Sequence, residues 1–298
     1  MSKTYRTVLN RATLYAACLA IASQTASAAS VVDDFESYAP GSFPTPTWLD
    51  VAVVLPVAAP LVNAPSPSAS VVTTTDAHGQ PTQALQTVNA LGVSKGIYTP
   101  VPISSSYSLF ADLRTVQYAD TSLDPLIAGP ATDWSMQLTF AQVNVSNFDN
   151  TPQAGVYASS QTQGWRLFLI GSNGGPSADI DLGVAAALGV WYSVELQIDA
   201  TTGSFRSVIK DAASGTLLDD TTNVIAGWQP QFGAFDSIAF FAGEVGATVP
   251  VSAGSTTIPN IGQVDNINVT TTPVPLPAPL WLLTSLLGGL ALRRRRAA

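Results

Sequence analysis

Four carboxylates near the two ends of the acidic part of the chain have the residue types of a cation site. Asp33, Asp34 and Glu36 lie close together early in the chain, and Asp265 lies far later. Calcium takes about 6–8 oxygen ligands, commonly carboxylates and backbone carbonyls. If the first and last strands pair, these four side chains converge, and the sequence then predicts a calcium site. The alternative is that the acids only solvate an exposed strand.

Residues suited to hydrolytic catalysis are sparse. His78 is the only histidine; it lies in the turn-like stretch 76–81, which predicts a solvated loop position. Glycosidases use two carboxylates about 5–10 Å apart. Glu195 and Asp199 share one face of a predicted strand, but their separation along it is about 13 Å. We therefore predict that the protein is not an enzyme; the alternative is a glycan-degrading lyase or hydrolase in which a neighbouring strand supplies the second carboxylate.

Aromatic side chains in predicted loops are the groups on which sugar rings could stack. Most large aromatic residues of a β-sandwich lie in its core, so the sequence assigns no sugar site to any of them. The candidates are Trp48, Tyr107, Tyr118, Trp134, Tyr157 and Trp228.

The elements that must position these residues show the patterns of β-strands. Apolar and polar side chains alternate at 136–140 and 192–198, the period of two that a half-buried strand has. The stretches 199–203 and 212–215 are typical of hairpin turns. No stretch of the body has a helical period. The sequence predicts an all-β protein, an antiparallel β-sandwich formed by one domain over residues 29–271.

The charge distribution divides the chain into a body and two ends. The 298 residues include 20 acidic and 12 basic side chains, for a formal net charge of −8. All 20 acids lie between Asp33 and Asp265, whereas seven of the 12 basic residues lie within the first 11 or the last six positions. Binding to a nucleic-acid backbone requires a basic surface, so we expect no nucleic-acid partner. The single cysteine, Cys18, excludes an intramolecular disulfide framework.

The N-terminal end has the order of a secretory signal peptide. Three basic residues precede an uncharged, mostly apolar run at 12–22, and the small residues Ala26 and Ala28 follow. This order predicts a signal peptide over residues 1–28 that is cleaved after Ala28, and therefore an exported protein. The alternative is an amphipathic N-terminal helix of a cytosolic protein.

The C-terminal segment, residues 272–298, predicts a membrane anchor. The polar stretch 270–273 is interpreted as a linker, and residues 276–292 are free of charge. A run of this length is at the lower edge for a transmembrane helix. Basic residues after it place the C-terminus in the cytoplasm and the body outside. The basic residues are Arg293, Arg294, Arg295 and Arg296.

The sequence Val274, Pro275, Leu276, Pro277, Ala278, followed by the apolar run and the four arginines, resembles the PEP-CTERM class of bacterial sorting signals in its VPLPA-CTERM variant. The resemblance implies a substrate of an exosortase, held in the inner membrane transiently and then passed to the cell surface or extracellular matrix. It also implies a Gram-negative host, often one that makes exopolysaccharide. The alternative is an ordinary C-terminal anchor.

Three short segments of the body resemble concanavalin A-like (laminin-G-like) jelly-roll proteins. They are residues 32–38 with Pro40, Gly41 and then Trp48, residues 191–196 followed by 202–205, and residues 264–267. The resemblance implies that the first and last strands pair, and it suggests glycan binding. Together the sequence predicts an exported, non-catalytic envelope or matrix protein that binds exopolysaccharide; a purely structural matrix protein is a further alternative.

Overall fold

The computed structural model describes residues 29–54, 68–89, 93–101, 104–118, 134–141, 153–159, 162–170, 178–199, 202–224, 235–242 and 260–273. The predicted signal peptide, the sorting motif and the four terminal arginines lie outside these residues. Among the described residues, no helix has the length and apolar character needed to cross a membrane.

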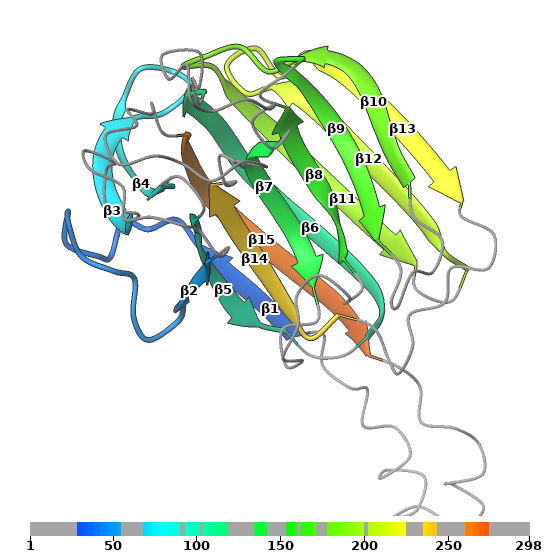
Figure 1. The fold of residues 1–298 in the computed structure, drawn as a ribbon, viewed down its shortest axis with the longest axis horizontal. Helices are drawn as coiled ribbons and strands as arrows, with labels where there is room; N and C mark the ends of the chain where they lie inside the picture. The colour runs from blue at the N-terminus through cyan, green and yellow to red at the C-terminus, as the bar shows by residue number, and fades with distance from the viewer. Residues whose placement is uncertain are drawn as a thin grey trace, which may run out of the picture.

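In the described parts of the chain, fifteen β-strands form two antiparallel sheets that pack face to face (Figure 1). The predicted antiparallel β-sandwich is therefore confirmed. The eight-stranded sheet has the order β13 (Leu217–Val224), β12 (Ser204–Asp211), β11 (Trp191–Asp199), β6 (Ser104–Gln117), β15 (Ile261–Pro273), β4 (Pro81–Val88) and β3 (Ser68–Thr75), and β1 (Ala29–Asp33) also pairs with β15. The seven-stranded sheet has the order β10 (Ala178–Ala185), β9 (Gly164–Ile170), β8 (Gln153–Ser159), β7 (Trp134–Ala141), β14 (Ser237–Ala242), β5 (Val93–Pro100) and β2 (Leu49–Val54).

The core lies between the two sheets and follows the predicted alternation. In β11, Tyr192, Val194, Leu196 and Ile198 are buried in the core, and the residues between them are half-buried on the outer face. Burial of a large apolar side chain contributes about 1.5–3 kcal/mol, so this alternation fixes which face of each strand turns inward. The side chains that remain outside are therefore the ones available for function.

Both predicted hairpins are present. β11 and β12 pair from Tyr192 with Asp211 to Asp199 with Ser204, and Gly203 in the turn has a φ of 70°. A positive φ is accessible to glycine at little steric cost. The second hairpin joins β12 to β13 through Gly215, whose φ is 69°.

The first and last strands pair as expected. β1 lies beside β15 (Figure 1), with Ala29 opposite Thr271 and Asp33 opposite Ile267. The linker predicted at 270–273 is wrong, because β15 continues to Pro273, which pairs with Ser104 of β6. The three threonines have high strand propensity; all three pair with β6, and Thr270 and Thr271 also pair with β1.

Both faces of β8 are buried, and at Gly155 this strand lies very close to the neighbouring β7. A Cβ on Gly155 would lie 2.3 Å from the carbonyl oxygen of Leu138 and 2.8 Å from the Cα of Thr139, on the neighbouring β7. These are backbone atoms, so relief of the clash requires the two strands to separate.

We predict that Gly155→Ala lowers the free energy of unfolding by about 1–3 kcal/mol, the usual cost of overpacking. Urea unfolding of the full chain measures the difference. Gly164→Ala is the matched control, because its nearest neighbours would lie at an ordinary 3.4 Å, and it should change stability by less than about 1 kcal/mol. Equal losses in the two variants would contradict the assigned contact.

Candidate functional site

The predicted cation ligands meet where β15 changes partner. β15 pairs with β4 as far as Val264 and with β1 from Ile267 onward. Between these two regions the register shifts, and Asn266 has a φ of 53°. Asp265 lies at this junction and is only 4% exposed.

Glu36 and Asp265 are brought together by one threonine. The Thr82 hydroxyl lies 2.6 Å from Oε1 of Glu36 and 3.2 Å from Oδ2 of Asp265. Glu36 Oε1 also accepts a hydrogen bond from the Gln83 backbone N–H at 2.7 Å. Glu36 therefore accepts a hydrogen bond from a backbone N–H of β4. This N–H lies beyond Leu85, the last residue of β4 that pairs with β15.

Asp33 is bonded to a different set of groups. Its Oδ2 accepts hydrogen bonds from the Trp48 indole N–H at 2.7 Å and the Tyr38 hydroxyl at 3.0 Å, and its Oδ1 accepts one from the Phe35 N–H at 2.9 Å. This buried carboxylate fastens the chain that follows β1 to the core. Asp34 is exposed and accepts a hydrogen bond from the backbone N–H of Glu36.

The structure thus joins two of the four predicted ligands and gives Asp33 a structural role. Within the described residues, no group of three or more His, Cys, Asp or Glu side chains is arranged to hold a metal ion. The calcium site stays a prediction.

The pKa of Asp265 is raised to about 7, chiefly by burial and to a smaller extent by the nearby charges of Asp112 and Glu36. Hydrogen bonds from the Asn266 N–H and the Thr82 hydroxyl oppose this rise. Asp112 is the cross-strand neighbour of Asp265 on β6. At acidic pH, therefore, Asp265 is a neutral acid in this junction.

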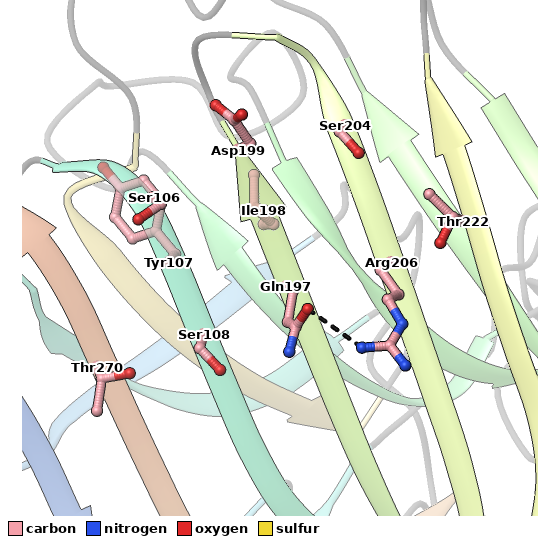
Figure 2. A pocket seen from close by; sticks show the side chains of 10 residues that line it. All are labelled: Ser106, Tyr107, Ser108, Gln197, Ile198, Asp199, Ser204, Arg206, Thr222 and Thr270. Atoms are coloured by element: carbon pink, nitrogen blue, oxygen red, sulfur yellow. Dashed lines mark hydrogen bonds between the residues drawn. The ribbon is translucent and has the colours of Figure 1, made fainter.

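An open groove of about 370 Å³ lies on the outer face of the eight-stranded sheet (Figure 2). It consists of two neighbouring rows of residues that cross the strands. The first row is Thr270, Ser108, Gln197, Arg206 and Thr222, which are successive partners across β15, β6, β11, β12 and β13. The second row includes Ser106, Asp199 and Ser204.

The groove presents hydroxyl, amide and charged groups to solvent. The side chains of Tyr107 and Ile198 lie behind the strands and are buried in the core. Serine and threonine hydroxyls both donate and accept hydrogen bonds, as the side-chain amide of Gln197 also does. This is the chemistry that recognises another array of hydroxyl groups.

Among the described residues that line the groove, Arg206 is the one cation, and it is already paired. Nε and Nη2 of Arg206 donate to the two oxygens of Asp220, each at 2.7 Å. Nη1 lies 3.4 Å from Oε1 of Gln197 (Figure 2), and Nε2 of Gln197 donates to Glu195 at 2.6 Å. The hydrogen bond from Arg206 lowers the pKa of Asp220, and that of Arg206 is raised in turn. These bonds hold the amide and guanidinium groups in position.

An exposed aromatic ring lies in the row beside the groove. Phe110 of β6 is 38% exposed, and its cross-strand partners are Asn268 of β15 and Glu195 of β11. Phe110 follows Ser108 by two positions, so the two side chains share a face and are about 7 Å apart along the strand. The ring of Phe110 therefore provides an apolar surface beside the polar groove.

The aromatic residues considered from the sequence do not form such a surface. Trp48, Tyr107, Tyr118 and Tyr157 are buried. The remaining two candidates, Trp134 and Trp228, have side chains outside the described residues. Phe110 was missed because only aromatic residues in predicted loops were considered, whereas Phe110 lies within the strand β6.

His78 lies where the sequence placed it, in an exposed turn. Oδ1 of Asp76 accepts hydrogen bonds from the backbone N–H groups of His78 and Gln80, each at 2.8 Å. Glu195 and Asp199 share the outer face of β11, as expected. Ala26, Ala28 and the motif at 274–278 lie outside the described residues.

No family model matches the chain, and no curated protein matches it. Solved structures with a similar architecture include arcelin-5, a lectin-like defense protein from Phaseolus vulgaris, at 11% identity and a TM-score of 0.44, covering 82% of this chain and 98% of that one. The basic winged bean lectin with Tn-antigen has 12% identity and a TM-score of 0.45, covering 83% and 100%. Cellulose induced protein Cip1 has 16% identity and a TM-score of 0.44, covering 83% and 99%. These likenesses assign neither a family nor a ligand.

We predict that stability falls as the pH rises from about 4 to about 7. The folded-state pKa of Asp265 is raised above its unfolded value, so the folded protein binds more protons in this window and loses stability as Asp265 ionises. Each pKa unit corresponds to about 1.4 kcal/mol. Urea unfolding of the full chain at several pH values measures the slope.

Asp265→Asn removes this titration and should flatten the profile between pH 4 and 7. Asp34→Asn is the control, because Asp34 is exposed and asparagine retains the oxygen that accepts from Glu36. An unchanged slope in Asp265→Asn would contradict the assignment.

Proposed function

We propose that this protein is an exported, non-catalytic glycan-binding protein of the bacterial envelope or extracellular matrix, and that the groove between β15 and β13 binds exopolysaccharide. The observation that carries the proposal is the groove itself, where hydroxyl and amide groups of five adjacent strands face solvent beside the exposed ring of Phe110. Hydroxyls and amides hydrogen-bond sugar hydroxyls, and an aromatic ring packs against the apolar face of a sugar.

The acids of the groove favour binding over cleavage. Among the described residues that line it, Asp199 is the only carboxylate, whereas hydrolysis by the usual mechanism uses a pair. Asp220, in the next row, is bonded through both oxygens to Arg206. A carboxylate held in this way is a poor general acid.

Export and sorting by an exosortase are proposed from the two ends of the chain. The order of basic, apolar and small residues over 1–28 supports export, and the motif at 274–278 with the apolar run and the four arginines after it supports sorting.

We predict that a bulky side chain in the groove weakens glycan binding. Ser108→Trp projects into the groove, and the full chain, purified in a non-glycosidic detergent, should lose at least about tenfold in affinity on a polysaccharide panel, which corresponds to about 1.4 kcal/mol. Val116→Trp is the matched control: it lies on the same face of β6, about 26 Å further along, and is already exposed.

Retained binding in Ser108→Trp would place the glycan site elsewhere. An absence of binding by the wild-type protein to every polysaccharide would favour a purely structural matrix protein. Release of reducing ends or unsaturated products would favour the enzymatic alternative.

We predict that the proline motif is required for sorting. In a host that encodes an exosortase, Pro275→Ala combined with Pro277→Ala should keep the protein in the inner-membrane fraction with its C-terminus intact, whereas the wild type is processed. Pro279→Ala, just outside the motif, is the control. Mass spectrometry of the C-terminal peptide measures the outcome, and identical processing of all three proteins would leave an ordinary anchor.

A further inference from the structure

We infer that the groove selects neutral glycans and excludes polyanionic ones such as polyuronates, an inference that rests on the glycan-binding function proposed above. Three carboxylates lie in the two rows of the groove and the row that contains Phe110: Asp199, Glu195 and Asp220. The same rows hold one cation, Arg206. The local charge is therefore negative.

Arg206 is a poor docking point for an anionic sugar. The planar guanidinium of an arginine binds a carboxylate through two parallel N–H donors, and in Arg206 the edge formed by Nε and Nη2 is bonded to Asp220. A uronate would meet only the remaining edge, where Nη1 lies 3.4 Å from Oε1 of Gln197 and where Asp220 already neutralises the charge. The pair keeps a cation in the groove while removing its attraction for anions.

In the part of the chain that the structure describes, the other cations of this outer face lie far from the groove or are bonded to other groups. Lys210 is on β12, about 13 Å beyond Arg206, which exceeds the screening length of about 8 Å at physiological ionic strength. Arg114 is about 20 Å from Ser108 along β6; its guanidinium lies 4.6 Å from the centre of the Trp191 ring, and its Nε donates to Gln263 at 2.9 Å. Neither Lys210 nor Arg114 therefore adds positive charge to the groove.

The long-range field acts in the same direction. Between the predicted signal peptide and the sorting segment the chain carries 20 acidic residues and five basic ones. A surface of this charge repels polyanions before contact. Neutral sugars are not repelled, and they can form hydrogen bonds with the hydroxyl and amide groups of Ser108, Gln197 and Thr270.

The test compares neutral and anionic polymers on the full chain in a non-glycosidic detergent at low salt. Dextran, mannan and galactan serve as neutral probes, and alginate and polygalacturonate as anionic ones. We expect binding to at least one neutral polymer and at least tenfold weaker binding to both polyuronates. Because repulsion is screened by salt, the difference should narrow at high ionic strength.

Asp220→Asn tests the role of the ion pair, because it frees the guanidinium of Arg206. This variant should gain roughly tenfold in affinity for polygalacturonate, in line with the strength of bidentate arginine–carboxylate bonds. Asp181→Asn is the control: it removes the same charge from an ion pair on the other sheet, where Arg166 keeps Asp179 at 2.9 Å.

The possible outcomes separate the inference from the proposed function. Wild-type binding to polyuronates as tight as to neutral polymers would overturn the inference and leave glycan binding standing. Absence of binding to all five probes would overturn both. An equal gain in Asp220→Asn and Asp181→Asn would show that net charge, not the Arg206–Asp220 pair, sets the selectivity.

Discussion

The pairing of the first strand with the last is the constraint on which the rest of the structure depends. β15 is a central strand: β6 lies on one side of it, and β4 and β1 share the other. The change of partner leaves a junction that cannot be filled by regular sheet bonds, and Asp265, Glu36 and Thr82 fill it with side-chain hydrogen bonds. Asp33 then ties the chain that follows β1 to the core through Trp48. Acids that a sequence alone would assign to a metal thus have a clear structural use.

The same central strand fixes the outer face on which the groove lies. Because β15 holds Thr270 opposite Ser108, and β11 holds Gln197 opposite both Ser108 and Arg206, the polar residues of five strands line up in rows. Strand register allows no small adjustment, since a slip of one residue would turn each of these side chains into the core. The groove is therefore as rigid as the sheet. A rigid site loses little conformational entropy when it binds a ligand.

The sequence allowed the local features of the fold to be predicted, and the resemblance of short segments added one long-range contact. Alternation in β11 and the glycine turns at Gly203 and Gly215 depend on neighbours along the chain, and both were found as expected. The end of β15 was not predicted correctly, because a run of threonines fits a linker and a strand equally well. Only the pairing with neighbouring strands distinguishes the two. The groove was not predicted because each of its residues is ordinary by itself. Only the registers of β6, β11, β12, β13 and β15 bring Ser108, Gln197 and Arg206 together.

The central claim is that the groove beside Phe110 is the glycan site, and a structure of the full chain with a bound neutral oligosaccharide tests it most directly. We expect sugar rings that lie across β6, β11 and β12, with hydroxyl groups within hydrogen-bond distance of Ser108 and Gln197 and with the Arg206–Asp220 pair intact. An oligosaccharide bound with full occupancy at any other surface, with the groove open to solvent, would contradict it.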